Sequence, residues 1–344
     1  MNYRSIINKG VTILKNNSIR TANLDAEILL SKSLNKTREE IILNLEEKLN
    51  INQIKHYYNL INRRKKKEPI SLITKKKHFW KSEFIVNKNV LTPRFETEFL
   101  VEEVLKFYKQ SKKIHVLDIG LGSGCILISL LKERNKWQGT GLDISSLAIE
   151  TAKTNAKIQQ VHNRIRFIKS DVDKFYIGKY DLIVSNPPYI NKIGYNSLDI
   201  GVKGFEPKLA LYGGIDGFRF IEKVIKKSKI ILKNNGLLAM EIGMGQYYKT
   251  SELLKNNGFF VLKIIKDYEP KSALYGGLDG FRIIEKVIKK SKTILKNNGL
   301  LAMEIGIGQY YKTSELLTKN GFFISKTVRD YQKIKRCLFA RKIK

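Results

Sequence analysis

The stretch Asp181-Leu-Ile-Val-Ser-Asn-Pro-Pro-Tyr-Ile190 decides the fold. Its first five residues form a short apolar run with a β-branched bias, which predicts a buried strand. The strand ends at Asn186-Pro-Pro-Tyr189, because two prolines fix φ and remove two backbone donors. We therefore expect the chain to leave a sheet here in a rigid, extended turn.

The residues of this turn suit chemistry on a planar –NH2 group. The side-chain carbonyl of Asn186 and the backbone carbonyl of Pro187 can accept its two N–H bonds, while Tyr189 lies flat against it. Held in this way, the nitrogen can be aimed at a methyl donor and its developing positive charge stabilised. The structural alternative is a proline-stiffened strand exit without chemistry. The candidate catalytic and substrate-binding residues are Asn186, Pro187, Pro188 and Tyr189.

A Rossmann-like pattern precedes this stretch. Strand and helix patterns alternate, which predicts an α/β fold with a mostly parallel sheet and ligands at the carboxyl ends of its strands. The glycines of Gly120-Leu-Gly-Ser-Gly124 let the backbone approach a ligand, and Asp143, at the end of the second strand, is placed to bind a ribose diol. A nicotinamide site would require glycine at position 125 and no later Asn-Pro-Pro-Tyr, so we set a dehydrogenase aside. The expected strands are 115–120, 139–143, 165–168 and 181–185, with helices at 125–134 and 145–156.

Composition gives broader bounds. The 344 residues include 64 Lys and Arg against 32 Asp and Glu, a formal net charge of +32. Such a charge suits an anionic partner, but Lys, Asn and Ile are abundant throughout, so we favour a compositional bias. Two distant cysteines indicate reduced thiols, and the four histidines have no metal-ligand spacing, so we expect no metal. Because no signal peptide or membrane-length apolar run is present, we expect a cytoplasmic protein without membrane contact, and a monomer.

The N-terminal region reads as a small helical domain, predicted to span residues 1–78, followed by a hairpin and linker at 79–98. The basic run Arg63 to Lys67 is typical of a solvated helix end, with a weak contact to ribosomal RNA as the alternative. Arg94 and Glu96 concentrate charge before the helix at Phe99. They mark either a helix N-terminus or a lid over a ligand, and we include them among the candidate substrate-binding residues.

With these residues in place, the chain resembles the HemK family of protein-(glutamine-N5) methyltransferases of peptide-chain release factors. The resemblance rests on the helical N-terminus, Thr92-Pro-Arg-Phe-Glu-Thr-Glu98, the glycine turn and Asn-Pro-Pro-Tyr, and covers essentially the whole chain. It implies a methyltransferase domain over 99–344, S-adenosylmethionine as cofactor, and the glutamine of a release factor's Gly-Gly-Gln loop as substrate. Phe95 stands where proline is usual, Lys75 where glycine is common, and Val172 where an aromatic residue is frequent. The implied cofactor-binding residues are Asp118, Gly120, Leu121, Gly122, Ser123, Gly124, Asp143, Asp171, Val172 and Asn186.

A tandem repeat departs from the family pattern. Residues 206–268 and 269–331 align without a gap, and 51 of 63 positions are identical. Removing one copy leaves 344 − 63 = 281 residues, a natural size for one methyltransferase with a helical domain. We interpret the repeat as a recent duplication within the gene.

Because of the repeat, the strand that should pair with the last strand of the sheet is present twice, at 259–265 and at 322–328. The last strand, 335–341, should pair antiparallel with 322–328 through a short turn, because a local hairpin has a low entropic cost. Ser325 and Thr327 give this strand the alternation of a half-exposed strand. We therefore expect the second copy to complete the sheet, and the strand Leu237 to Ile242 of the first copy to be unpaired or at an edge.

Two other functions stay open from sequence. An adenine-N6 methyltransferase would use the same Asn-Pro-Pro-Tyr chemistry on DNA or RNA and would suit the positive charge. Against it, the chain has no inserted target-recognition domain. A protein that binds cofactor without turnover would result if the repeat spoiled the sheet.

Overall fold

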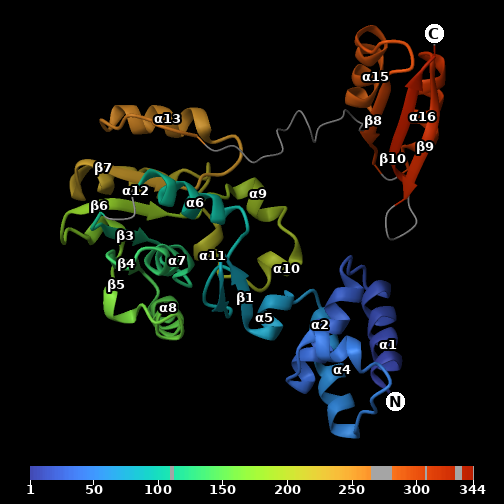
Figure 1. Cartoon of the computed structure of the whole chain (residues 1–344). Helices are drawn as coiled ribbons and strands as arrows, with labels where there is room; N and C mark the ends of the chain where they lie inside the picture. Colours follow the sequence, from blue (N-terminus) through green and yellow to red (C-terminus); the bar gives the residue numbers. More distant parts are fainter. Residues whose placement is uncertain (109–111, 265–280, 307, 330–334, 344) are drawn as a thin grey trace. The chain divides into compact units, whose positions relative to one another are not determined.

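The computed structural model describes residues 1–108, 112–264, 281–306, 308–329 and 335–343. The chain forms two compact units, Met1–Lys263 and Ile264–Lys344 (Figure 1). Among the described helices, none is both long and apolar enough to cross a membrane.

The N-terminal helices pack around their own apolar core. Tyr57 is fully buried there, and a Cβ added to Gly10 would lie 2.0 Å from its hydroxyl oxygen, so the two helices approach closely. The predicted capping box is confirmed: the side chain of Thr37 accepts from Glu40 N, and the Glu40 side chain accepts from Thr37 N. The helices are α1 Tyr3–Asn16, α2 Ala22–Leu34, α3 Arg38–Leu43, α4 Ile51–Lys65 and α5 Ile70–Thr74.

The basic run at the end of α4 is partly engaged within this helical region. Arg64 Nε lies 2.7 Å from Oδ2 of Asp25, whose side chain is only 4% exposed. Arg63 Nη2 lies 2.5 Å from Glu68 Oε1, and Lys67 donates to the carbonyl of Asn17. These contacts favour a structural role for three of the five basic residues.

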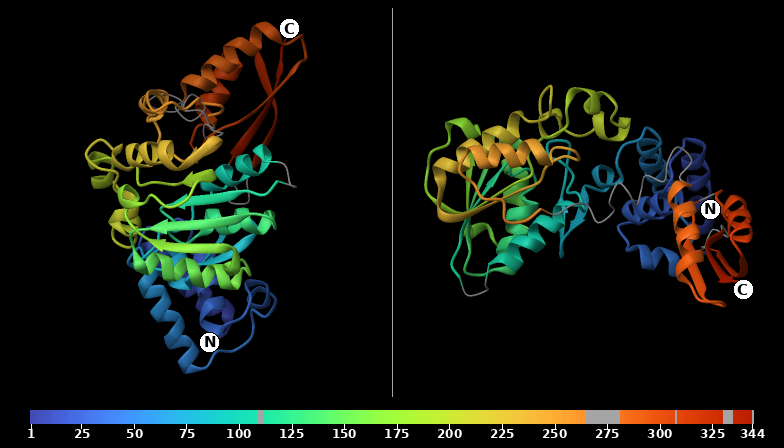
Figure 2. Two further views of the ribbon diagram at one scale, coloured as in Figure 1. Left: turned by 90° about the vertical axis from the view of Figure 1, so that its left-hand side faces the viewer. Right: turned by 90° about the horizontal axis from the view of Figure 1, so that it is seen from above.

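A five-stranded sheet forms the centre of the first unit. Its order is β5-β4-β3-β6-β7 and every pairing is parallel, where the sequence predicted a mostly parallel sheet. Figure 2 shows the strands side by side with helices on either side. A separate antiparallel hairpin, β1 Lys76–Phe79 with β2 Ser82–Ile85, follows the helical region. The sheet strands are β3 His115–Ile119, β4 Gln138–Asp143, β5 Ile165–Lys169, β6 Tyr180–Ser185 and β7 Leu232–Met240.

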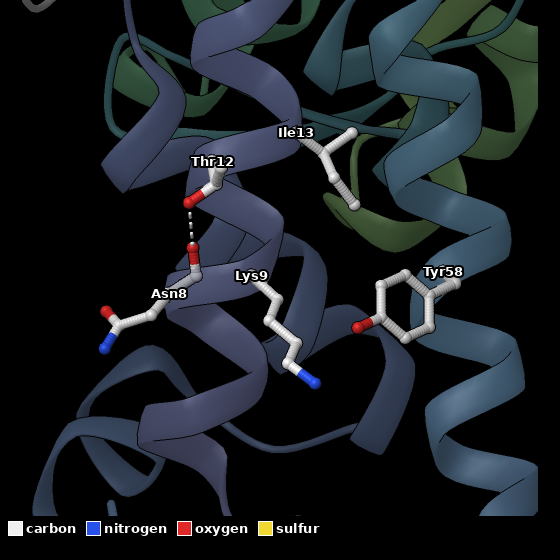
Figure 3. Close-up of a pocket in the computed structure, with 5 residues that line it drawn as sticks. All are labelled: Asn8, Lys9, Thr12, Ile13 and Tyr58. Atoms are coloured by element: carbon white, nitrogen blue, oxygen red, sulfur yellow. Dashed lines mark hydrogen bonds between the residues drawn. The ribbon is translucent and has the colours of Figure 1, made fainter.

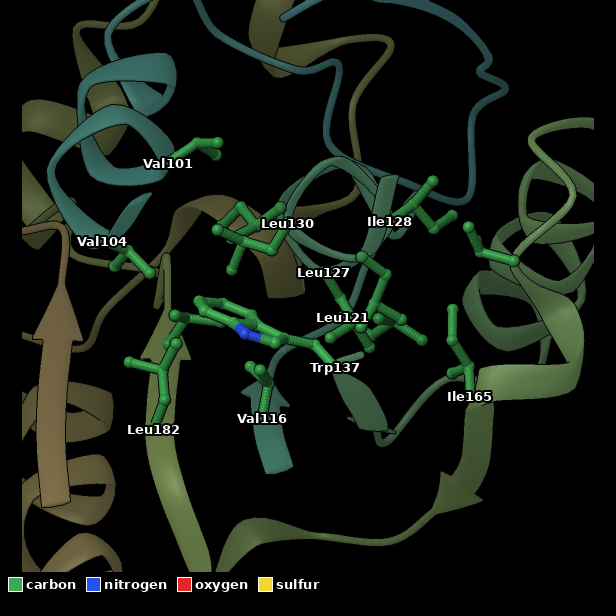
Figure 4. Packing of buried hydrophobic residues seen from close by; sticks show 14 of the residues in the cluster. Val101, Val104, Val116, Leu121, Leu127, Ile128, Leu130, Trp137, Ile165 and Leu182 are labelled. Atoms are coloured by element: carbon green, nitrogen blue, oxygen red, sulfur yellow. The ribbon is translucent and has the colours of Figure 1, made fainter. Parts of the chain in front are cut away.

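Both faces of the sheet are buried, which explains the continuous apolar runs in its strands. On one face Trp137, fully buried, packs with Val116 and Leu182 beneath α6 and α7 (Figure 4). On the other face Leu117 and Ile183 pack with residues of α12. The helices are α6 Thr97–Phe107, α7 Cys125–Glu133, α8 Ser146–Ile158, α12 Arg219–Ile231 and α13 Tyr247–Asn256, with short helices α9 Lys192–Asn196, α10 Ile200–Lys203, α11 Lys208–Leu211, η1 His162–Arg164 and η2 Val172–Lys174.

The first repeat, not the second, completes this sheet, so our expectation was wrong. Strand β7 lies against β6, with Leu237 opposite Leu182 and Met240 opposite Ser185. The two copies carry the same strand sequence, so connection length decides between them. The first copy reaches the sheet edge through a crossover beginning at Tyr189, whereas the second would leave 63 more residues to be looped out.

The second repeat and the C-terminus form the other unit. Its sheet has the order β8-β10-β9 and is antiparallel, and the predicted hairpin between the last two strands is confirmed. Its core includes Ile288, Leu317 and Phe322, all fully buried. In the first copy, residues 259–264 form no strand, and Phe260 is 85% exposed. The elements are α15 Arg282–Ile294, β8 Leu300–Glu304, α16 Tyr310–Lys319, β9 Phe322–Arg329 and β10 Lys335–Lys342.

Candidate active site

The glycine turn between β3 and α7 requires its glycines. Gly120, Gly122 and Gly124 have φ of 81°, 55° and 79°, a region that L side chains rarely adopt. A Cβ built at Gly120 would meet no heavy atom of the described residues within 4 Å. The backbone here therefore borders open space, as a ligand cradle requires. Leu121 and Ser123, between the glycines, are buried and contribute to packing.

Asp143, at the end of β4, holds this turn in place. Its Oδ2 accepts from Gly122 N at 2.9 Å, and its Oδ1 accepts from Ser145 N at 2.8 Å. Burial raises the pKa of Asp143, while the backbone donors oppose that shift. Because each carboxylate oxygen has two lone-pair directions, Asp143 can also accept from a ligand hydroxyl.

Asp118 carries a deeply buried carboxyl group in this site. It is 1% exposed, and within the described residues neither carboxylate oxygen has a hydrogen bond of ordinary distance and angle. Burial raises the pKa of Asp118 to about 8. A buried carboxylate with so few hydrogen-bond partners keeps acceptor capacity for a ligand that donates hydrogen bonds or carries positive charge. A cationic ligand group fits this environment.

Asp171 and Val172 lie at η2, after β5. The Asp171 side chain accepts from Asp173 N at 3.0 Å and lies 3.7 Å from Lys223 Nζ. Val172 is buried in the cluster that contains Leu117. It therefore packs into the core of the sheet, and its contact with a cofactor stays a prediction.

The Asn-Pro-Pro-Tyr turn is tied to two other elements by a chain of hydrogen bonds. Asn186 Nδ2 donates to Thr97 Oγ1 at 3.0 Å, and Thr97 donates to Glu241 Oε2 at 2.7 Å. Tyr189 Oη donates to Glu241 Oε1 at 3.1 Å. Burial raises the pKa of both Glu241 and Tyr189. Pro187 is buried and Pro188 half-buried, so the turn is packed as well as hydrogen-bonded.

Sequence reasoning missed Thr97 and Glu241. Thr97 lies inside Thr92-Pro-Arg-Phe-Glu-Thr-Glu98, a segment in which the charged residues give the stronger functional signal. Glu241 directly follows a strand, which is the signal that identified Asp143, but the same glutamate recurs as Glu304 in the second repeat. The repeat concealed which of the two belongs to the site.

The first repeat also closes around the turn. Gln246 Nε2 donates to the carbonyl of Tyr189 at 3.1 Å, and its Oε1 accepts from Gly243 N at 2.7 Å. A Cβ added to Gly213 would lie 2.6 Å from the carbonyl oxygen of Pro188. The turn is therefore fitted to the residues of the first copy.

Arg94 forms an ion pair with a buried carboxylate. Its Nη2 lies 2.6 Å from Oε2 of Glu206, whose side chain is 1% exposed. Burial raises the pKa of Glu206, and Arg94 opposes the shift. Arg94 thus anchors the start of the first repeat, while Glu96 is exposed and leaves its predicted substrate contact to be tested.

The pocket drawn in Figure 3 lies apart from these groups in the sequence and in the fold. It is lined by residues of α1 and α4 and contains none of the predicted site residues. Among the described residues, no group of three or more His, Cys, Asp or Glu side chains is arranged to hold a metal ion. The lining residues are Asn8, Lys9, Thr12, Ile13 and Tyr58.

Two family models match the chain. Residues 5–74 match the PrmC N-terminal domain, and residues 95–201 match the methyltransferase small domain. The two matches cover the helical region and four of the five strands of the sheet, including those that lead into the glycine and Asn-Pro-Pro-Tyr turns.

Curated relatives extend these matches over most of the chain. A release factor glutamine methyltransferase of Clostridium acetobutylicum is 37% identical over 271 residues, covering 78% of this chain and 95% of the relative. The enzyme of that name from Fusobacterium nucleatum is 36% identical, covering 83% and 79% respectively. The one from Caulobacter vibrioides is 37% identical, covering 74% and 88%.

Proposed function

The chain belongs to the family of release factor glutamine methyltransferases, and we propose that it methylates the side-chain amide nitrogen of the glutamine in the Gly-Gly-Gln loop of release factors. The methyl donor is S-adenosylmethionine.

One observation carries the proposal: the two predicted binding turns begin at neighbouring strand ends. Ile119, the last residue of β3, pairs with Ser185, the last residue of β6, and Ser185 Oγ donates to the carbonyl of Ile119 at 2.7 Å. The glycine turn follows the first of these residues and Asn186 follows the second. A donor bound at one turn and an amide bound at the other would therefore be adjacent, as direct transfer requires.

The residues present fit the methyl donor. Its ribose hydroxyls suit Asp143, its cationic groups suit the buried carboxylate of Asp118, and the open space beside Gly120 leaves room for its chain. When bound, S-adenosylmethionine supplies a methyl group on a positively charged sulfur.

The chain's own residues would orient the acceptor amide. Asn186 Oδ1 and the Pro187 carbonyl would accept its two N–H bonds and stabilise the positive charge that develops on nitrogen. The ring of Tyr189, fixed by its bond to Glu241, would lie against the amide plane. The nitrogen loses one proton to solvent after the N–CH3 bond forms, so no side chain needs to act as a base.

Methyl transfer to purified release factor tests this function. Asn186→Ala should lower the rate by about 10²–10³, the usual effect of losing one positioned group at a reacting centre. Its affinity for S-adenosylmethionine should stay within a few fold of the parent. DNA and RNA offered in place of the release factor should accept no methyl group. A variant that methylates the release factor at nearly the parent rate would overturn the role of Asn186.

A further inference from the structure

We propose that Glu241 is a positioning residue: acting through Thr97, it fixes which end of the Asn186 amide faces the substrate. The inference rests on the proposed function and extends it to a residue outside the Asn-Pro-Pro-Tyr turn. It follows from the direction of each hydrogen bond in the chain Glu241, Thr97, Asn186.

The Thr97 hydroxyl has a single proton. In the structure that proton goes to Glu241 Oε2, which accepts it at 2.7 Å. Toward Asn186 the Thr97 oxygen is therefore an acceptor, and Asn186 must turn its –NH2 group to it at 3.0 Å. The orientation of the Asn186 amide follows from this network.

The consequence falls on the other end of the same amide. With Nδ2 held by Thr97, Oδ1 of Asn186 is left to accept from the –NH2 group of a substrate glutamine. A flipped Asn186 would set two –NH2 groups face to face, and neither could accept a hydrogen bond. The correct rotamer is thus secured before substrate arrives, and the enzyme does not spend binding energy on selecting it.

Glu241 is itself held rigidly. Its backbone N–H donates to the carbonyl of Ser185 at 3.0 Å, which continues the pairing of β7 with β6 by one residue. Its second carboxylate oxygen accepts from Tyr189 at 3.1 Å. One carboxylate therefore sets both the Asn186 amide and the Tyr189 hydroxyl, and the sheet fixes the carboxylate.

A carboxylate is needed because both of its oxygens accept. Glutamine at position 241 would place an –NH2 group against either Thr97 or Tyr189. Facing Thr97, that group would occupy the hydroxyl oxygen and free the Thr97 proton to bind Asn186 in the flipped orientation. Facing Tyr189, it would keep the Asn186 orientation but would remove the acceptor of the Tyr189 hydroxyl proton. Burying a neutral amide costs less free energy than burying a carboxylate. We therefore expect Glu241→Gln to lower the catalytic rate and not the stability of the fold.

The second repeat offers a matched control within the same chain. Glu304 occupies the equivalent position in an identical run, Leu300-Leu-Ala-Met-Glu-Ile-Gly306, but its strand pairs with β10, where Glu304 is opposite Cys337. Glu304→Gln makes the same chemical change in the same local sequence. It should leave methyl transfer at the parent level.

The test compares Glu241→Gln, Glu304→Gln and Thr97→Val in the full chain, with methyl transfer to release factor as the readout. We expect Glu241→Gln to lower kcat by about 10²-fold, in the range seen for losing an aligned polar group. KM for the release factor and affinity for S-adenosylmethionine should change less than a few fold. Thr97→Val removes the connecting hydroxyl without altering Glu241, so it keeps the test decisive if Glu241→Gln folds poorly.

The double variant of Glu241 and Thr97 distinguishes a positioning role from a general loss of structure. If Glu241 acts through Thr97, the double variant should lose little more activity than the worse single variant, because the two changes break one chain. Multiplied losses, or a Glu241→Gln enzyme with more than half the parent kcat, would overturn the inference. If the parent itself fails to methylate release factor, the proposed function has failed instead.

Discussion

At the scale of single residues, the site stores unfavourable free energy in Asp118. Within the described residues this buried carboxylate has no hydrogen bond of ordinary distance and angle, and burial raises its pKa to about 8 from an ordinary value of 3.8. A raised pKa means that the folded state binds the proton more tightly than the unfolded state does. The group therefore lowers stability progressively as the pH rises from about 4 to about 8. A ligand cation would remove that penalty.

Asp118→Asn should accordingly stabilise the protein without ligand while weakening cofactor binding. The amide keeps the shape and cannot ionise, so we expect a gain of at least about 1 kcal/mol near pH 8, roughly 2–4 °C in Tm, and almost none near pH 4. Thermal unfolding across this pH range measures the gain, and calorimetry with S-adenosylmethionine measures the affinity. A variant whose gain is independent of pH would show that the Asp118 carboxylate is not the source.

The turn chemistry was predictable from sequence, but the network behind it was not. The glycines can be recognised in the sequence because the turn needs their backbone conformation. Asn186 can be recognised because its side chain supplies an acceptor beside two prolines. Thr97 and Glu241 carry no such local signature. They become recognisable only when a helix start and a strand end are brought within hydrogen-bond distance of Asn186.

At the scale of elements, the structure explains one departure from the family pattern. Lys75 follows the last residue of α5 with φ 61° and ψ 23°, the left-handed conformation that closes many helices. Glycine adopts it without a Cβ clash, whereas lysine is strained by about 1 kcal/mol. This is the physical reason for glycine at such a position.

Lys75→Gly should therefore stabilise the protein by about 0.5–1 kcal/mol, the relief of strain being partly offset by the greater freedom of glycine in the unfolded chain. Chemical denaturation of the parent and variant measures the difference. The neighbouring change Lys76→Gly, in strand β1, is the control and should destabilise instead. Loss of stability in Lys75→Gly would contradict the assigned strain.

The sequence predicted which segments form strands and which two strands form the last hairpin. It did not predict which of the two repeat copies joins the central sheet. The short connection between 322–328 and 335–341 predicted the hairpin of β9 with β10, which is confirmed. The sequence pattern could not say which sheet that hairpin joins, because Leu237 to Glu241 and Leu300 to Glu304 are identical in sequence. Connection length from Tyr189 settled the sheet in favour of the first copy.

At the scale of the whole molecule, the two repeats supply two strands of identical sequence, β7 and β8, with which a single C-terminal strand, β10, could pair. Strand β8 pairs with β10, whereas within the described residues the outer edge of β7 has no partner. Further along the chain, after helix α13, the apolar residues Phe260 and Leu262 are 85% and 61% exposed. An open sheet edge with exposed apolar residues promotes self-association.

Deleting either copy of the repeat should reduce this self-association and should preserve methyltransferase activity. The junctions coincide, so removing 206–268 or 269–331 yields chains of 344 − 63 = 281 residues that differ only at the 63 − 51 = 12 variable positions. Both should methylate release factor and should elute as smaller, more uniform species by light scattering. Loss of activity in either deletion would mean that the second unit contributes to the reaction.

In the proposed reaction this chain places a methyl group on one glutamine side chain, and residues of the first repeat complete the site. Mass spectrometry of release-factor peptides after reaction with S-adenosylmethionine tests it most directly. We predict one added methyl group on the glutamine of the Gly-Gly-Gln loop, produced by the parent and by Glu304→Gln but almost absent with Asn186→Ala and Glu241→Gln. Methylation at another residue, or equal losses in Glu241→Gln and Glu304→Gln, would contradict the account.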